Sequence, residues 1–242
     1  MPNVSQQGDR TQIANDSDNQ GPFEGFLYGR PFAYTSYESD FTKFITDEWT
    51  STLVEAGGGE STITLADLSG GQLLLTCDAN ENDGINLQLG GTAEGETTGE
   101  SFAAVAGKNL YFETRIKMVD ATQFDFFFGL HVEDTSVIAS KGSDYIGFRS
   151  DDGDLELDVE SSSGSSASDT TNIATLANDT FIKLAFKVTG VSKIECWVND
   201  TLTSTITSDI PTALMKLSMC VLTGEAVANT AHVDYVGVWQ EK

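Results

Sequence analysis

The chain has 242 residues, with 37 acidic against 13 basic side chains and a formal net charge of -24 at pH 7. This balance argues against binding a nucleic-acid backbone or an anionic membrane, because both attract clustered Lys and Arg. It suits bound divalent cations or a basic partner surface, and it equally suits an acidic exterior that is merely solvated. The sequence leaves these alternatives open.

The N-terminal region divides into two parts of different composition. Residues 1–21 are polar and have no apolar segment of a signal peptide, so we expect an arm that is disordered alone or orders against a partner. Residues 22–37 are rich in aromatic side chains without a clean period, which indicates an extended strap over a surface of the same or a neighbouring subunit. The strap residues expected to contact a partner are Phe23, Phe26, Leu27, Tyr28, Phe32, Tyr34 and Tyr37. We predict an arm and strap over residues 1–40 and one domain over residues 41–242.

The rest of the chain is a succession of strand-length runs separated by turn signals. Short runs lie at residues 61–65, 73–77 and 85–89. The two runs within residues 109–133 follow, and in the second of them Phe124, Phe126, Phe128, Leu130 and Val132 share one face. At about 25 cal/mol per Å2, this apolar face needs a second layer to cover it.

Later runs have the same period of two. They lie at residues 145–149, 155–160, 182–188, 194–198, 217–221 and 232–240. The Asp-Gly turn at residues 151–153 predicts a hairpin, and the Ser-rich residues 161–169 predict a mobile loop. With no convincing helix of three turns, the chain is predicted to be an all-β sandwich.

The cysteines are odd in number and have no framework spacing. Cys196 and Cys220 lie in apolar strand runs, as expected of buried free thiols, and Cys77 closes a third run. No stretch approaches the length of a transmembrane span. Without a signal peptide or such a span, we expect the chain to be made and used in the cytoplasm, unless it leaves by lysis.

One strand carries a pattern of acids typical of catalysis. Glu156, Asp158 and Glu160 alternate, so their carboxylates share one face in steps of about 7 Å. Paired carboxylates perform glycoside hydrolysis. Three acids on a wet strand face also arise easily in a chain this acidic, and the tryptophans lie far away in sequence. We therefore favour a solvated face and expect no enzymatic activity.

Oxygen-bearing side chains also alternate over residues 78–84, as a calcium loop requires. Gly84 comes one place late for an EF-hand, and Leu89 stands where that loop needs a Glu. A simpler calcium site and a polar turn remain open, and the turn is favoured. His131 and His232 are too few for a histidine metal site, so no metal or cofactor is expected.

Three strings resemble the concanavalin A-like, or laminin-G-like, jelly roll. They are residues 181–186, residues 196–200 with their turn asparagine, and the closing strand at residues 233–239. The resemblance implies an all-β jelly-roll β-sandwich, here with an extended N-terminal arm. The row Glu156, Asp158 and Glu160 is similar to the Glu-x-Asp-x-Glu strand of laminarinase-type glycoside hydrolases, which share this fold. That likeness would make them nucleophile, orienting residue and acid/base.

A narrower likeness is to virion proteins of tailed bacteriophages. The strings that resemble them lie at residues 108–112, 120–125, 145–154 and 179–184. The resemblance implies a capsid decoration, or cement, protein on the virion surface, assembled in the host cytoplasm. Its partners would be the major capsid protein and copies of itself, as a homo-oligomer with a trimer first and a dimer next.

Two alternatives belong to other functional classes. One is a carbohydrate-binding or receptor-binding virion module, for which Trp197 is the candidate aromatic platform. The other is the glycoside hydrolase that would use Glu156 and Glu160.

Overall fold

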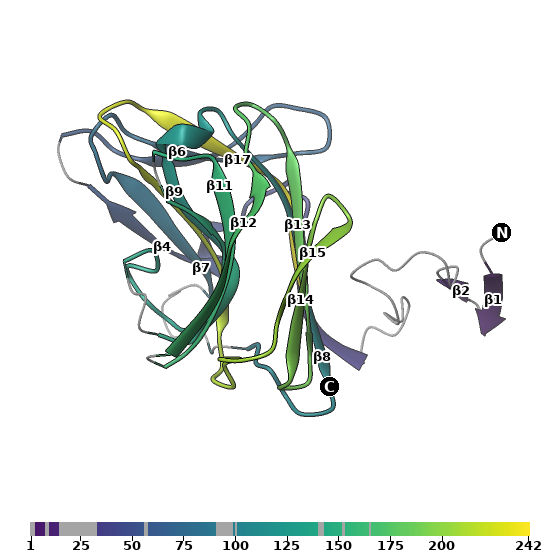
Figure 1. Ribbon diagram of the computed structural model, residues 1–242. Helices are drawn as coiled ribbons and strands as arrows, with labels where there is room; N and C mark the ends of the chain where they lie inside the picture. The colour runs from purple at the N-terminus through teal and green to yellow at the C-terminus, as the bar shows by residue number, and fades with distance from the viewer. Residues whose placement is uncertain are drawn as a thin grey trace.

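The computed structural model of the chain is a sandwich of two antiparallel β-sheets that face each other (Figure 1). The residues that the structure describes are 3–7, 10–14, 33–55, 58–90, 99, 101–139, 143–151, 153–164 and 166–242. In this part of the chain, helix is limited to single turns, and none is long and apolar enough to cross a membrane. The prediction of an all-β sandwich is confirmed.

The first sheet has seven strands. In spatial order they are β12 (Ser166–Thr175), β11 (Glu156–Ser163), β10 (Tyr145–Ser150), β9 (Phe124–His131), β16 (Lys216–Thr223), β7 (Gly84–Leu89) and β4 (Trp49–Val54). The predicted hairpin of β10 and β11 is present, with Gly153 in the left-handed region at φ 85°. The predicted Ser-rich loop is wrong, because its residues continue β11 and begin β12, where Ser161 and Ser162 are fully buried.

The second sheet has eight strands. Along its main path they are β15 (Thr201–Ile206), β14 (Lys193–Val198), β13 (Ile182–Thr189), β8 (Asn109–Met118), β17 (Asn229–Glu241), β6 (Leu73–Cys77) and β5 (Thr62–Leu65). The eighth, β3 (Tyr34–Ser39), pairs with the second half of β17, next to the stretch that pairs with β6. A strand that sequence analysis assigned to the strap is thus part of the sandwich. Two further strands, β1 (Asn3–Gln7) and β2 (Arg10–Ala14), pair with each other.

The core is the space between the sheets, and β8 and β9 supply its centre. These strands follow each other in sequence through the short turn η3 (Ala121–Gln123), yet they belong to opposite sheets. Phe112 on β8 stacks on Phe186 with ring centroids 4.8 Å apart and meets Phe148 of the facing sheet at 6.5 Å. All three rings are fully buried. This aromatic contact joins the two layers.

The cysteines lie in this protected interior as free thiols, as predicted. Cys77, Cys196 and Cys220 are all buried and form no disulfide. Burial raises the pKa of the Cys77 thiol to about 12, and it raises those of Cys196 and Cys220 further. In the folded chain at neutral pH the three side chains therefore act as small apolar groups.

Replacing Phe112 by Ala should destabilise the sandwich strongly, because it leaves a cavity between two rings of the core. We expect the free energy of unfolding to fall by about 3–5 kcal/mol in a denaturant titration. Val191→Ala is the control, since Val191 lies in an exposed turn and should change the value by no more than about 0.5 kcal/mol. Equal losses in the two variants would contradict the assignment of Phe112 to the core.

Candidate functional site

The acidic strand predicted from the sequence is β11, and its three carboxylates share one face. Leu157 and Val159 are fully buried in the core, so the alternate residues point away from it. Glu156, Asp158 and Glu160 form this β11 carboxylate row on the outer face of the seven-stranded sheet. The sequence therefore placed the three residues together correctly.

Asn172 of the neighbouring strand β12 orients two of the three acids. Its side-chain amide donates to Glu156 Oε1 at 2.7 Å, and its backbone N–H donates to Asp158 Oδ1 at 2.7 Å. This position is available because the register between β11 and β12 shifts between Leu157 and Val159, and Asn172 adopts a positive φ of 55°. A bulge in the edge strand thus aims one asparagine at two carboxylates.

Arg149 on β10 holds the third acid from the opposite side. Its guanidinium lies 3.2 Å from Glu160 Oε2 and 3.0 Å from Asp151 Oδ1. The side chains of Arg149 and Glu160 are only 9% and 13% exposed. Burial acts to lower the pKa of Arg149, but the bonds to Asp151 and Glu160 outweigh it and raise that pKa. Glu156 is therefore drawn toward β12 and Glu160 toward β10.

The centre of the same outer face is covered by the chain that follows β9, which we call the covering segment (residues 132–139). Val137 and Ile138 pack on a small second core of Phe127, Tyr145 and Cys220. In this core the His131 ring stacks on Tyr145, with centroids 5.3 Å apart and planes within 3°. Burial, reinforced by Glu160, raises the pKa of Tyr145. These rings are enclosed by the protein and are not offered to a ligand.

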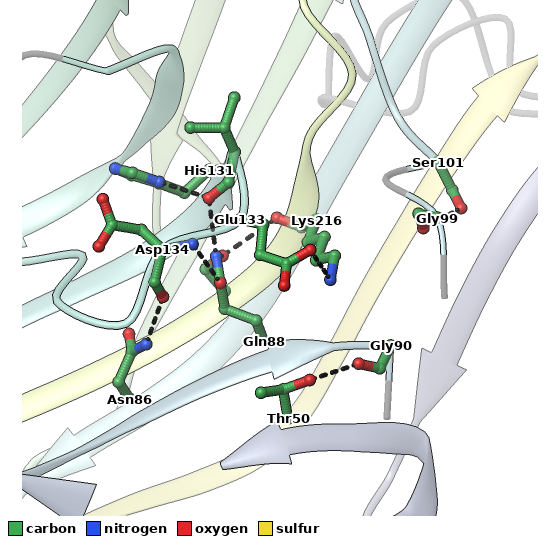
Figure 2. A network of polar contacts seen from close by, with 12 residues as sticks. Thr50, Asn86, Gln88, Gly90, Gly99, Ser101, His131, Glu133, Asp134 and Lys216 are labelled. Atoms are coloured by element: carbon green, nitrogen blue, oxygen red, sulfur yellow. Dashed lines mark hydrogen bonds and ion pairs between the residues drawn. The ribbon is translucent and has the colours of Figure 1, made fainter. Parts of the chain in front are cut away.

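Polar side chains of two strands fasten the start of the covering segment to the sheet (Figure 2). Gln88 donates to the Val132 carbonyl at 3.0 Å. It also accepts from the Asp134 N–H at 2.8 Å, and both of these residues are labelled in Figure 2. Asn86 donates to the Asp134 carbonyl, and Lys216 reaches the Glu133 carboxylate at 2.9 Å. The covering segment thereby occupies the middle of the outer face, and the carboxylate row lies at the β10–β12 end beside it.

In residues 78–84, the stretch considered for calcium, the side chains form hydrogen bonds with one another. The Asn80 amide donates to Asp83 Oδ2 at 2.9 Å and lies 3.5 Å from Asp78 Oδ2. Across the residues that the structure describes, no group of three His, Cys, Asp or Glu side chains is arranged to hold a metal ion. The alternative of a simple calcium site stays a prediction.

The residues predicted to bind a partner have different outcomes. Phe23, Phe26, Leu27, Tyr28 and Phe32 lie outside the described residues. Tyr34 and Tyr37 lie on β3, where Tyr34 is buried and the Tyr37 ring meets Trp49 edge-on at 5.6 Å. Both tyrosines therefore contribute to packing within the sandwich, and their role in partner binding stays a prediction.

The aromatic platform predicted at Trp197 is wrong. Trp197 is only 6% exposed, so its ring is not available as a platform for a ligand. Sequence analysis missed Tyr235 and Trp239, which are half-buried and line a groove of about 400 Å3. Their spacing with Gly237 was a usable signal, since alternate residues of one strand share a face.

Comparison with other proteins supports the fold and leaves the family open. No protein-family model and no curated protein sequence matches the chain. A β-1,3-1,4-glucanase (lichenase) from a mouse hindgut metagenome superposes with a TM-score of 0.57 and 15% identity, over 84% of this chain and 98% of its own. The β-glucanase of Bacillus licheniformis gives 0.57 and 15% over 86% and 98%, and peanut lectin gives 0.53 and 9% over 86% and 97%. At these identities the likeness shows a concanavalin A-like jelly roll.

These neighbours correct one sequence-based prediction. The chain was expected not to be an enzyme, but several solved structures of the same architecture are glucanases, including an endo-glucanase from Bacteroides ovatus. The prediction that the chain is not an enzyme is therefore wrong, because this fold is shared with enzymes. The resemblance to phage virion proteins is supported only at the level of the jelly roll that they share with these neighbours.

Replacing Arg149 by Met should destabilise the chain, because Glu160 would remain poorly solvated without its partner. We expect a loss of about 3–5 kcal/mol in the free energy of unfolding, since removing one member of a buried ion pair is costly. The double variant Arg149→Met with Glu160→Met should recover most of this loss in the same denaturant titration. A double variant as unstable as Arg149→Met alone would show that the ion pair is not the cause.

Proposed function

We propose that the chain binds a β-glucan-type polysaccharide, and that the β11 carboxylate row is the contact surface. The observation that carries the proposal is the orientation of three neighbouring carboxylates by fixed donors. Asn172 holds Glu156 and Asp158 through one oxygen each, at 2.7 Å in both cases. A carboxylate has about four acceptor positions, so each of these acids can still accept bonds from sugar hydroxyl groups.

The arrangement suits recognition because its members are already in place before a ligand arrives. An acidic side chain held by a neighbour loses little rotamer freedom on binding. The row lies on a rigid strand beside the edge of the sheet, so an extended polymer can lie along β11 and β12. Glucanases and a lectin share the fold, which supports a carbohydrate ligand by analogy of architecture.

Hydrolysis by the same row is the second candidate. It is favoured by the alternation of Glu156, Asp158 and Glu160 on one strand and by the glucanases among the structural neighbours. A retaining mechanism needs its two carboxyl groups only about 5–5.5 Å apart. Here the outer acids are engaged by opposite strands, Glu156 by Asn172 and Glu160 by Arg149. Binding therefore ranks first, because it uses the carboxylates in the positions that Asn172 and Arg149 already hold.

The capsid decoration role stays a prediction. The structural neighbours named above include no virion protein, and the strap on which that role depends lies mostly outside the described residues. A glycan-binding jelly roll is compatible with a virion surface, and the proposed binding does not depend on that location.

Binding is tested with laminarin and mixed-linkage β-glucan in affinity electrophoresis of the full chain. We expect retardation of the natural chain, and a retardation reduced at least about tenfold in Glu156→Gln and in Asp158→Asn. Each variant removes one oriented acceptor charge, and a tenfold change corresponds to about 1.4 kcal/mol. Glu225→Gln is the matched control, because it removes one negative charge from an exposed loop elsewhere.

Reducing-sugar release from the same polysaccharides separates the two candidates. Retardation without release supports binding, whereas release that Glu156→Gln abolishes identifies the row as catalytic. If neither polysaccharide retards the chain, or if Glu225→Gln weakens retardation as much as Glu156→Gln does, the proposal fails.

A further inference from the structure

A groove on the outer face of the eight-stranded sheet lies over the paired strands β3 and β17, beside the chain that follows β3. It encloses about 400 Å3 and is formed by Glu38, Ser39, Asp40, Thr42, Lys43 and Tyr235, Val236, Gly237, Trp239. The antiparallel register places Glu38 opposite Gly237 and Ser36 opposite Trp239. The groove therefore has a strand of alternating aromatic residues on one side and polar side chains on the other.

Gly237 allows the Trp239 ring to lie down over the strand. A Cβ atom at Gly237 would stand 2.1 Å from Trp239 Cη2 and 2.6 Å from Cζ2, so the benzene part of the ring occupies that space. The indole N–H donates to Glu38 Oε1 at 2.5 Å, which fixes the ring from the β3 side. The ring is thus held in one orientation by a missing side chain and by one hydrogen bond.

Tyr235 is held equally firmly at the other end of the groove. Its hydroxyl donates to Glu113 Oε1 at 2.7 Å, and Glu113 is in turn paired with Lys183 at 3.3 Å. Burial and the neighbouring Glu113 charge raise the pKa of Tyr235, so the ring stays neutral over the ordinary pH range. The distance between the two aromatic side chains is therefore set before any ligand binds.

The polar wall supplies acceptors, a hydroxyl and one cation. Glu38, Asp40, Thr42 and Lys43 are all exposed, and Asp40 Oδ1 accepts from the backbone N–H and the hydroxyl of Thr42 at 3.1 and 3.0 Å. Two carboxylates disfavour an anionic ligand. A purely apolar ligand would cover these groups without pairing them, which is unfavourable. A neutral ligand with one apolar face and several hydroxyl groups satisfies both sides of the groove.

We propose that this groove binds a pyranose unit of a neutral oligosaccharide, with the sugar ring on Trp239 and its hydroxyl groups on Glu38 and Asp40. Aromatic rings with a polar edge suit a ligand that has one apolar face and hydrogen-bonding groups on the other side. A volume of about 400 Å3 lies within the range of small-ligand sites, about 300–1,000 Å3. The site uses no residue of the β11 carboxylate row and lies on the other sheet, so it does not rest on the function proposed above.

The test is titration of the full chain with cellotetraose and with laminaritetraose, followed by tryptophan fluorescence and by calorimetry. Trp49 and Trp197 are 4% and 6% exposed, so a ligand-induced change in fluorescence reports mainly on Trp239. We expect a saturable change with at least one tetrasaccharide. Gly237→Ala should weaken binding at least about tenfold by displacing the ring, and Glu38→Gln should weaken it a few-fold.

Controls separate a lost site from a lost fold and from the other proposed surface. Glu38→Gln alters an exposed side chain, so an unchanged thermal unfolding midpoint makes its weaker binding attributable to the groove. Glu225→Gln, which changes an exposed loop outside both surfaces, should leave the calorimetric and fluorescence signals unchanged. Polysaccharide retardation that Glu156→Gln and Asp158→Asn leave unchanged, together with a tetrasaccharide-induced fluorescence change that Gly237→Ala weakens, would refute the β11 proposal alone.

Three outcomes would overturn the groove proposal. They are the absence of saturable binding up to the solubility of both tetrasaccharides, saturable binding that neither Gly237→Ala nor Glu38→Gln weakens, and binding only of a cationic glucosamine oligomer that is abolished by salt. The last outcome would show that the groove attracts charge and does not recognise a sugar ring.

Discussion

The fold depends on the contact between phenylalanine side chains of the two facing sheets. Phe112 leaves β8 and meets Phe148 of the facing sheet, while Phe186 stacks on it from the adjacent strand β13. Neither sheet can bury its apolar face without the other. Because the apolar residues of β11 and β17 are buried between the sheets, the residues that alternate with them lie on the two outer faces. The two proposed binding surfaces are formed by these outward-facing residues.

The two outer faces are used differently. Over the seven-stranded sheet the covering segment hides Phe127 and Tyr145, so the face that remains is polar and its contacts are hydrogen bonds. Over the eight-stranded sheet the strand β17 keeps Tyr235 and Trp239 next to a groove. The net charge of -24 is therefore not only a solvated exterior. Some of its carboxylates are held in fixed positions by Asn172, Arg149 or Trp239.

Period-two patterns predicted most strands of the two sheets and the face of each residue within them, but missed β3, β12 and β15. They placed Glu156, Asp158 and Glu160 together, because all three belong to one strand. They could not identify Asn172, whose amide reaches Glu156 only because a bulge in β12 turns it there. They singled out Trp197 and passed over Trp239, because a period-two pattern does not show how much of a ring on the outer face is covered. The Ser-rich stretch was misassigned because its composition resembles a loop, whereas it forms the end of β11 and the start of the edge strand β12.

The reactivity of the three buried cysteine thiols can be used to measure how often the folded chain opens. A thiol reacts through its thiolate, and burial keeps Cys77, Cys196 and Cys220 protonated while the sheets stay together. Cys77 and Cys196 face the space between the layers, whereas Cys220 lies beneath the covering segment. Alkylation at Cys220 ahead of the other two would therefore measure how often that segment lifts, and simultaneous alkylation of all three would measure separation of the whole molecule.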